Sequence, residues 1–235
     1  MPDYLETIYF VDEYGPDKYP QKLCNYLTER YFKAEADSPK TLLDIGSGKG
    51  NHLVGFSRNG MIVKGLDKRK ECIEILPDCD IRECDFEKEP FPFEDNYFDF
   101  VFSKSVLEHV HNTENIVKET YRVLKPGGVT VQLTPDWATD YKYFWDDPTH
   151  VKPFTRKGLM EAFMFEDFVE VKCEGFYQLP FLWKYPKLDF IRCIIALVVP
   201  NSLKFKDKEE RIQRVLIRHS KERMLLLSAR KPYQK

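Results

Sequence analysis

Short apolar runs alternate along the chain with longer stretches whose apolar residues recur at helical spacing. The apolar runs predict buried strands at residues 41–45, 61–66, 79–83, 98–103, 129–133, 168–173 and 224–229. The longer stretches predict helices at residues 20–32, 51–58, 69–76, 113–124 and 155–163. Thr113 and Thr155 suit the N-cap positions of the last two helices. This alternation predicts an α/β domain with a doubly wound, mostly parallel sheet and helices on both faces.

The first predicted strand ends beside an acid and continues into a glycine-rich turn. Residues 41–50 read Thr-Leu-Leu-Asp-Ile-Gly-Ser-Gly-Lys-Gly. Glycines in such a corner let the backbone approach a ligand where a Cβ would clash. A dinucleotide fingerprint needs a glycine at Asn51, so a nicotinamide dehydrogenase is the least favoured alternative. Asp44, two residues before the turn, favours a ligand with a cationic amino-acid end, as in S-adenosylmethionine.

The turn is the first of several landmarks that follow one another in a fixed order. The others are Gly65-Leu66-Asp67, Cys84-Asp85-Phe86, residues 92–103, Val106-Leu107-Glu108-His109-Val110 and Leu124-Lys125-Pro126-Gly127-Gly128. Together they resemble the class I S-adenosylmethionine-dependent methyltransferases of the small-molecule branch, the methyltransferase type 11 group. The resemblance covers residues 38–174, with a final strand near 222–230. It implies a Rossmann-like, seven-stranded, mostly parallel sheet whose last strand is antiparallel.

The same resemblance implies S-adenosyl-L-methionine as cofactor and S-adenosyl-L-homocysteine as product. The methionine part is then held by Asp44 and by the turn that contains Gly46, Ser47, Gly48 and Gly50. Asp67 would accept both ribose hydroxyls, a bidentate task that suits a carboxylate. The remaining cofactor contacts implied for this chain are Leu66, Lys68, Asp85, Phe86, Ser103 and Leu107.

Candidate catalytic residues follow the fifth predicted strand. Residues 145–154 read Trp-Asp-Asp-Pro-Thr-His-Val-Lys-Pro-Phe, a proline-stiffened loop. We expect Asp147 to orient His150, which would take a proton from a substrate hydroxyl. His109, just past the fourth strand, is a second candidate base. The alternative is a loop-bracing Asp–His hydrogen bond, and we expect no metal at Asp146, Asp147 and His150.

Composition and charge limit the partners. The net charge of −2 argues against general nucleic-acid binding, although residues 201–235 hold 11 Lys and Arg against 4 Asp and Glu. The six cysteines form no Cys-x-x-Cys pair, so we predict reduced thiols, a cytoplasmic location and no structural zinc. No apolar run approaches the ~20 residues of a transmembrane helix.

Two segments lie outside the predicted core of residues 38–174. Residues 1–37 are interpreted as a cap or lid, and residues 175–220 as an insertion before the final strand and tail at 221–235. The insertion begins with an aromatic, proline-punctuated stretch. Apolar and basic residues at 188–214 favour either peripheral membrane contact or helix packing and a homodimer contact.

We therefore predict a methyltransferase that acts on a small-molecule, saccharide or lipid-linked acceptor, with methylation at oxygen. Two alternatives stay open. One is a lipid or quinone methyltransferase at the membrane surface. The other is a non-catalytic module that binds S-adenosylmethionine.

Overall fold

A seven-stranded sheet forms the centre of the protein. The computed structural model describes residues 18–32, 38–75, 79–204 and 215–233. The strand order is β3-β2-β1-β4-β5-β7-β6. Strands β1 to β5 pair in parallel, and β7 is antiparallel to both of its neighbours. The expected doubly wound sheet, with its last strand antiparallel, is therefore confirmed.

The strands lie close to the apolar runs in the sequence. Their bounds are β1 Thr41–Ile45, β2 Ile62–Asp67, β3 Asp80–Glu83, β4 Phe98–Lys104, β5 Leu124–Pro135, β6 Val169–Phe176 and β7 Met224–Arg230. The largest difference from expectation is β5. It begins at Leu124, whereas we predicted Val129, because Leu124 pairs with Phe98 ahead of the bulge in the β4–β5 ladder.

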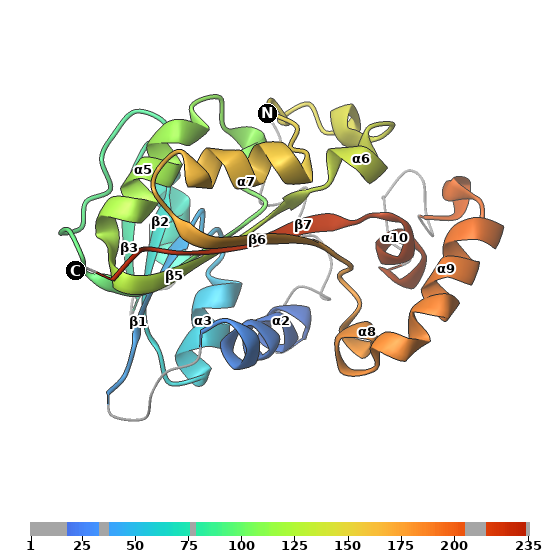
Figure 1. Cartoon of the computed structure of the whole chain (residues 1–235), viewed down its shortest axis with the longest axis horizontal. Helices are drawn as coiled ribbons and strands as arrows, with labels where there is room; N and C mark the ends of the chain where they lie inside the picture. Colours follow the sequence, from blue (N-terminus) through green and yellow to red (C-terminus); the bar gives the residue numbers. More distant parts are fainter. Residues whose placement is uncertain (1–17, 33–37, 76–78, 205–214, 234–235) are drawn as a thin grey trace.

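Helices cover both faces of the sheet (Figure 1). Helices α2 Tyr19–Arg30 and α3 Asn51–Arg58 lie on one face, and α5 Thr113–Val123 and α7 Arg156–Met164 lie on the other. Each face has its own apolar core. Leu23, Leu27 and Phe56 belong to the first, and Ile116 and Phe163 to the second. The remaining helices of the core region are α4 Lys70–Ile75, η2 Leu107–His109, α6 Trp137–Asp140 and η3 Phe144–Asp146.

The two predicted N-caps have different outcomes. Thr155 precedes α7, and its side chain accepts a hydrogen bond from Gly158 N at 3.2 Å, as expected. The prediction of Thr113 as the cap of α5 is wrong. Asn112 is the N-cap, and its amide oxygen accepts from Asn115 N, while Thr113 is the first helical residue and is buried. Asparagine and threonine both cap helices, so residue type alone could not decide which of the two adjacent residues is the N-cap.

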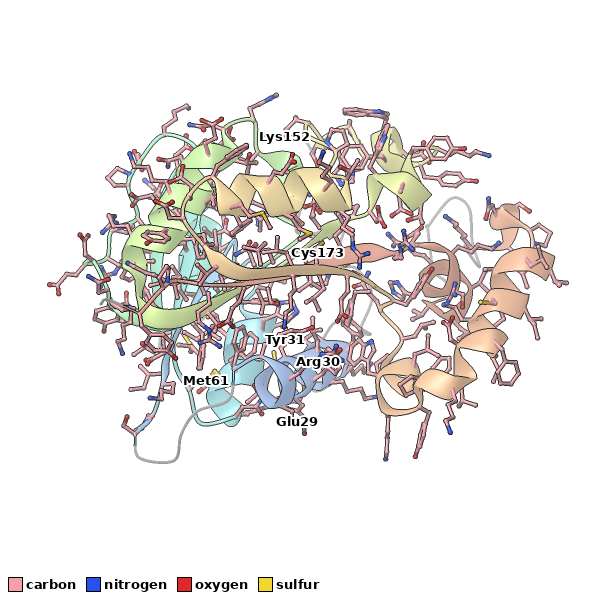
Figure 2. The ribbon with its side chains drawn as sticks, in the orientation of Figure 1. Glu29, Arg30, Tyr31, Met61, Lys152 and Cys173 are labelled. Atoms are coloured by element: carbon pink, nitrogen blue, oxygen red, sulfur yellow. The ribbon has the colours of Figure 1, made fainter. Side chains whose placement is uncertain are left out.

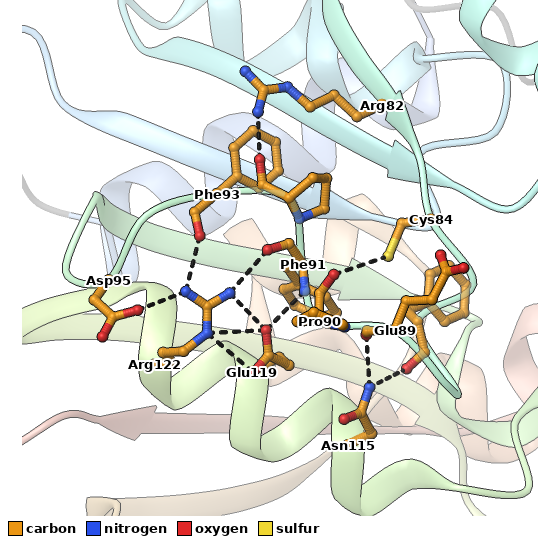
Figure 3. A network of polar contacts seen from close by, with 12 residues as sticks. Arg82, Cys84, Glu89, Pro90, Phe91, Phe93, Asp95, Asn115, Glu119 and Arg122 are labelled. Carbon is orange, nitrogen blue, oxygen red and sulfur yellow. Dashed lines mark hydrogen bonds and ion pairs between the residues drawn. The ribbon is translucent and has the colours of Figure 1, made fainter.

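Arg122 of α5 fixes the loop between β3 and β4 (Figure 3). Its guanidinium donates to the carbonyl oxygens of Phe91 and Phe93, both at 2.8 Å. It also pairs with Glu119 at 2.6 Å and with Asp95 at 2.7 Å. Glu119, which is nearly buried, accepts from Phe91 N at 2.7 Å as well. The loop that carries the predicted adenine contacts is therefore held firmly against the helical layer.

The edge of the sheet at β6 contacts both helical layers (Figure 2). Tyr31, which follows α2, donates to a carboxylate oxygen of Glu174 at 2.9 Å, and Arg30 pairs with the same carboxylate. Cys173, the preceding residue on β6, belongs to the core on the opposite face. Because successive side chains of a strand point to opposite faces of the sheet, β6 contacts α2 on one face and the α5–α7 layer on the other.

The segment between β6 and β7 is helical where it is described. It comprises α8 Pro180–Lys184, η4 Pro186–Leu188, α9 Asp189–Val198, η5 Asn201–Leu203 and α10 Val215–Lys221. The proposed lid residues before position 18 lie outside the described residues. Helix α9 buries none of its residues, and Leu197 and Val198 are 87% and 70% exposed. Within the described part of the chain, no helix has the length and apolar character needed to cross a membrane.

Candidate functional site

The carboxyl ends of β1, β2 and β4 meet at one edge of the sheet, which we call the rim. Strand β1 lies between the other two, and Ile45 at its end pairs with Leu66 on one side and Ser103 on the other. Ligands of open α/β sheets bind outside such carboxyl ends, where the strand order reverses. The sequence-predicted residues of the glycine-rich turn and of the β2 end are thus brought together.

The glycine-rich turn is folded back onto β2. The N–H groups of Gly46 and Ser47 both donate to Leu66 O, at 2.8 and 2.9 Å. Gly46 has a φ of +69°, and a Cβ at this position would collide with the side chain of Val106. Only glycine combines this conformation with so close a neighbour. The turn therefore has little freedom to accept another residue at its first position.

Asp44 is a buried acid without a neutralising partner in the described structure. Its side chain is 2% exposed, and Oδ2 has no hydrogen-bond partner among the described residues. Burial, together with the charge of Asp67, raises the pKa of Asp44 well above its usual range. The hydroxyl of Ser47, in the adjoining turn, is also buried and has no partner in the part of the chain that the structure describes. A ligand with a cationic group and hydrogen-bonding atoms would satisfy both residues.

Asp67 stands at the end of β2, next to the turn. One carboxylate oxygen accepts from Gly48 N at 2.9 Å, and the other accepts from Arg69 N and Nε at 3.1 and 3.2 Å. The side chain is almost completely buried. The position fits the predicted ribose acid, and each oxygen has lone pairs beyond those used here.

Asp85, Phe86 and Lys68 form a small group beyond the end of β3. Lys68 Nζ lies 3.0 Å from Asp85 Oδ1 and 4.9 Å from the centre of the Phe86 ring. Burial acts to raise the pKa of Asp85, but hydrogen bonds from Lys88 and Lys68 lower it to about 2. Asp85 is therefore ionised at neutral pH and remains an acceptor, as the predicted adenine contact requires.

Two predicted cofactor residues point elsewhere in this structure. Ser103 is fully buried in β4, and its hydroxyl donates to the side-chain oxygen of Gln132 on β5. Leu107 is 1% exposed and belongs to the core under α5 and α7. Both residues follow or end β4 close to the rim. Their side chains, however, are occupied by the bond to Gln132 and by core packing.

The predicted catalytic residues do gather at the rim. The His109 and His150 rings lie 4.8 Å apart, centre to centre. The expected Asp147–His150 hydrogen bond is absent, because His150 Nε2 lies 3.9 Å from Asp147 Oδ2. His150 is oriented by the Phe144 carbonyl, which accepts from Nδ1 at 2.6 Å. Asp147 accepts instead from Thr149 N at 2.9 Å and from its hydroxyl at 2.6 Å.

Electrostatics at the rim follow from burial. Burial first, and the neighbouring His150 second, lower the pKa of His109, which is therefore neutral at neutral pH. For Asp147, partial burial acts to raise the pKa, but the hydrogen bonds from Thr149 lower it below its usual value. The rim thus presents the neutral imidazole of His109 beside the ionised carboxylate of Asp147.

Sequence reasoning missed Glu108 and Lys104 as site residues. Glu108 is 1% exposed and accepts from the Thr134 hydroxyl at 2.9 Å, and burial raises its pKa to about 7. Burial lowers the pKa of Lys104 to about 8, although the charge of Glu108 opposes this shift. The available signal was a charged residue ending the buried strand β4, followed within one turn by an acid.

Comparison with known proteins finds methyltransferases that match part of this chain. Residues 43–131 match the family described as "Methyltransferase domain". Sterol 24-C-methyltransferase of Pneumocystis carinii is 30% identical over 122 residues, 47% of this chain and 31% of the relative. Phosphoethanolamine N-methyltransferase 2 of Caenorhabditis elegans is 28% identical over 134 residues, 54% of this chain and 30% of the relative. The matches thus span about a third of the length of these relatives.

Solved structures share the fold over nearly the whole chain. Phosphoethanolamine N-methyltransferase 2 of Haemonchus contortus, solved with S-adenosyl-L-methionine, gives a TM-score of 0.66 at 18% identity, covering 98% of this chain and 59% of that one. An S-adenosylmethionine-dependent methyltransferase from Archaeoglobus fulgidus gives 0.66 at 21% identity, covering 97% and 100%. The methyltransferase resemblance of the sequence motifs is therefore confirmed over residues 43–131, and the fold is shared over nearly the whole chain.

Proposed function

We propose that this chain, whose residues 43–131 form a methyltransferase domain of the class I fold, is an S-adenosylmethionine-dependent methyltransferase. The observation that carries the proposal is Asp44, a buried carboxylate at the rim whose Oδ2 has no partner among the described residues. The ammonium group of the cofactor's methionine part has the positive charge that would balance this carboxylate. Burial makes such a pairing stronger than it would be in water.

The residues that would hold the cofactor follow the order of the strands. Asp44, Ser47 and the backbone of the 46–50 turn would hold the methionine part, with Asp67 on the ribose. Asp85 and the backbone of Phe86 would hold the adenine. When bound, the cofactor supplies a methyl group activated by the adjacent sulfonium. The protein's part is to align an acceptor with that methyl and to keep water out.

We propose a small-molecule or glycan-like acceptor that is methylated at oxygen. An aromatic cluster extends from His150 through Phe144, and its members Trp145 and Tyr141 are 55% and 51% exposed. Exposed aromatic faces suit stacking on a sugar or a ring. The imidazole nitrogens of His109 and His150 suit contact with a hydroxyl that must lose its proton. Members of the family named for sterols and for phosphoethanolamine have different acceptors, so family membership alone does not choose one.

A second candidate acceptor class is a lipid at a membrane surface. It is favoured by the exposed apolar residues of α9, of which Phe190, Ile194 and Leu197 are each more than half exposed. Lys184 and Lys187 lie just before this helix and would meet anionic headgroups. A homodimer through the same face is the competing explanation.

The experiment that tests cofactor binding is calorimetric titration with S-adenosylhomocysteine. We expect micromolar binding by the native protein and a loss of at least about tenfold in affinity for Asp67→Ala, because a bidentate acceptor is removed. Asp167→Asn, an exposed acid in the turn after α7, is the matched control and should bind as the native protein does. Absence of binding by the native protein would contradict the proposal.

A non-catalytic binding module remains the alternative if the product binds but no methyl is transferred. A methyl-transfer assay across sugars, small alcohols and lipids separates the two. Transfer to any acceptor excludes the binding-module reading, whereas cofactor binding without transfer across all three classes supports it.

A further inference from the structure

Glu108, His109 and His150 form a compact group at the rim, which we call the Glu-His-His group. Each offers one ligand atom, and these atoms all lie within 4.8 Å of one another. Glu108 and His109 belong to η2, which begins three residues after the end of β4, whereas His150 comes from the loop between η3 and α7. The two segments are bonded together, since Val151 N and Lys152 N donate to Glu108 O at 2.8 and 3.1 Å.

Hydrogen bonds select the nitrogen that each imidazole presents. His150 Nδ1 lies 2.6 Å from the Phe144 carbonyl, and His109 Nδ1 lies 3.2 Å from the Thr149 carbonyl. A carbonyl oxygen only accepts, so both Nδ1 atoms carry the hydrogen and both Nε2 atoms carry the lone pair. Metal-binding histidines are typically held by this kind of bond from the second ring nitrogen.

Thr149 and Asp147 form a second set of contacts that hold the His109 ring. His109 Nδ1 is also 3.0 Å from the Thr149 hydroxyl, which in turn donates to Asp147 Oδ1 at 2.6 Å. The chain His109–Thr149–Asp147 therefore ends on a carboxylate. Such an outer carboxylate fixes the ring orientation and raises the basicity of the ligating nitrogen.

Glu108 supplies the negative charge of the group. It is almost completely buried, and its Oε2 accepts from the Thr134 hydroxyl at 2.9 Å. A carboxylate in such surroundings is costly to ionise unless a cation balances it. A bound cation beside the two imidazoles would supply that balance.

We propose that Glu108, His109 and His150 bind one divalent metal ion of the zinc class, through the carboxylate and the two Nε2 atoms. Two imidazoles and one carboxylate, with a further position open, is a ligand set of catalytic zinc and non-haem iron sites. Metal–ligand bonds of about 2.0–2.2 Å place ligand atoms about 3–4 Å apart, so the ligand atoms, which lie within 4.8 Å of one another here, would move closer together on binding. This site differs from the Asp146, Asp147 and His150 cluster considered from the sequence.

The open coordination position could hold the acceptor hydroxyl, a role for the ion that rests on the proposed function. Val106, two residues before Glu108, packs against Gly46 of the turn, so the group lies close to the proposed methionine part of the cofactor. An acceptor hydroxyl on the ion would have a lowered pKa and would release its proton to solvent. Its oxygen would then bond to the methyl carbon, while the carbon–sulfur bond breaks and its electron pair stays on sulfur.

Metal binding is tested on full-length protein that has been stripped with a chelator. Calorimetric titration with Zn²⁺ should give one ion per chain. The affinity should fall at least about tenfold in His150→Ala and in His109→Ala, and by about tenfold in Asp147→Asn, which removes outer support. His111→Ala, an exposed histidine two residues from His109, is the matched control and should leave the affinity unchanged. Equal affinity in the native protein and His150→Ala, or equal losses in His111→Ala, would overturn the proposal.

Two further measurements keep the test independent of folding and of cofactor binding. Native protein titrated with Co²⁺ should develop the intense visible bands of a low-coordinate site, whereas the spectrum of the hydrated ion alone would overturn the proposal. S-adenosylhomocysteine binding is measured separately on the stripped protein. If it persists while no metal binds, the metal site is wrong and the proposed function stands. If metal binds and S-adenosylhomocysteine does not, the metal site stands and the proposed function is wrong.

Discussion

At the residue scale, Asp44 is a buried acid whose proposed role in cofactor binding would oppose stability. A buried carboxylate without a partner disfavours the ionised folded state, and both burial and Asp67 raise its pKa. A structural acid would be expected to have a partner in a fold that pairs most of its buried polar atoms. Because Asp44 Oδ2 has no partner among the residues that the structure describes, we propose that this residue binds a ligand.

Asp44→Asn should therefore separate binding from stability. The amide has the same shape and no charge, so urea unfolding at neutral pH should give an unfolding free energy equal to or above the native value. Affinity for S-adenosylhomocysteine, measured by calorimetry, should fall by at least about tenfold, because the ammonium group loses its counter-charge. A variant that binds normally but is destabilised would show that Asp44 has a structural role.

His219 provides a pH-dependent contribution to stability. It is 6% exposed in α10, Gln178 Nε2 lies 3.5 Å from its Nδ1, and Tyr19 stacks beside it. Burial and the nearby charge of Arg218 lower its pKa to about 3. The unfolded chain, with an ordinary histidine, binds the proton more readily, so this contribution is complete above pH about 6.5 and is lost as the pH falls towards 3.

The expected result is a loss of up to about 1.4 kcal/mol per pH unit from this residue between pH 6.5 and 4.5. Urea unfolding of the native protein and His219→Gln across that range isolates the contribution, because the difference between the two curves should shrink as the pH falls. The exposed His111→Gln is the control and should follow the native curve. A pH-independent difference between native protein and His219→Gln would contradict the assignment of a buried neutral imidazole.

At the scale of elements, α5 and the β3–β4 loop form one unit through Arg122. Arg122→Ala should lower the unfolding free energy by about 2–3 kcal/mol, since it leaves the nearly buried Glu119 without its ion-pair partner and frees two loop carbonyls. Lys118→Ala, an exposed position on the same helix, should change stability by less than about 0.5 kcal/mol. Equal effects of the two substitutions in denaturant unfolding would show that the network in Figure 3 contributes nothing.

The elements themselves could be predicted because their signals are local. Apolar runs and a glycine turn fix β1 and α3 to the residue, and Thr155 opens α7 as expected. The side-chain partners could not be predicted, because they depend on neighbours far along the chain. Ser103 bonds to Gln132 and His150 to the Phe144 carbonyl, and neither pairing follows from spacing. The convergence of Glu108 with His150, 42 positions later, likewise appears only in the fold.

At the scale of the whole molecule, the helices between β6 and β7 extend away from the sheet (Figure 1). Helix α9 leaves its apolar side uncovered among the described residues, and this region carries part of the basic excess of residues 201–235. Such a pairing of apolar and basic surface is typical of membrane-interface helices.

Leu197→Asp tests this surface without touching the core, because Leu197 is 87% exposed. If α9 contacts lipid, native protein should sediment with anionic vesicles, and the variant should bind about tenfold more weakly after losing one apolar anchor. Phe165→Asp, an 83% exposed apolar residue beyond α7, is the control and should sediment normally. Native protein that ignores vesicles, with a dimer in analytical ultracentrifugation that Leu197→Asp dissociates, would assign the face to self-association.

The central claim is methyl transfer to a small, water-soluble acceptor, and the most direct test follows the methyl group. The protein is incubated with methyl-labelled S-adenosylmethionine and a panel of saccharides, small alcohols and lipids, with Asp67→Ala as the matched variant. We predict label in the water-soluble saccharide or alcohol fraction for the native protein and none above background for the variant. Label confined to lipid would contradict the proposed acceptor class, and no label anywhere, despite micromolar cofactor binding, would contradict catalysis itself.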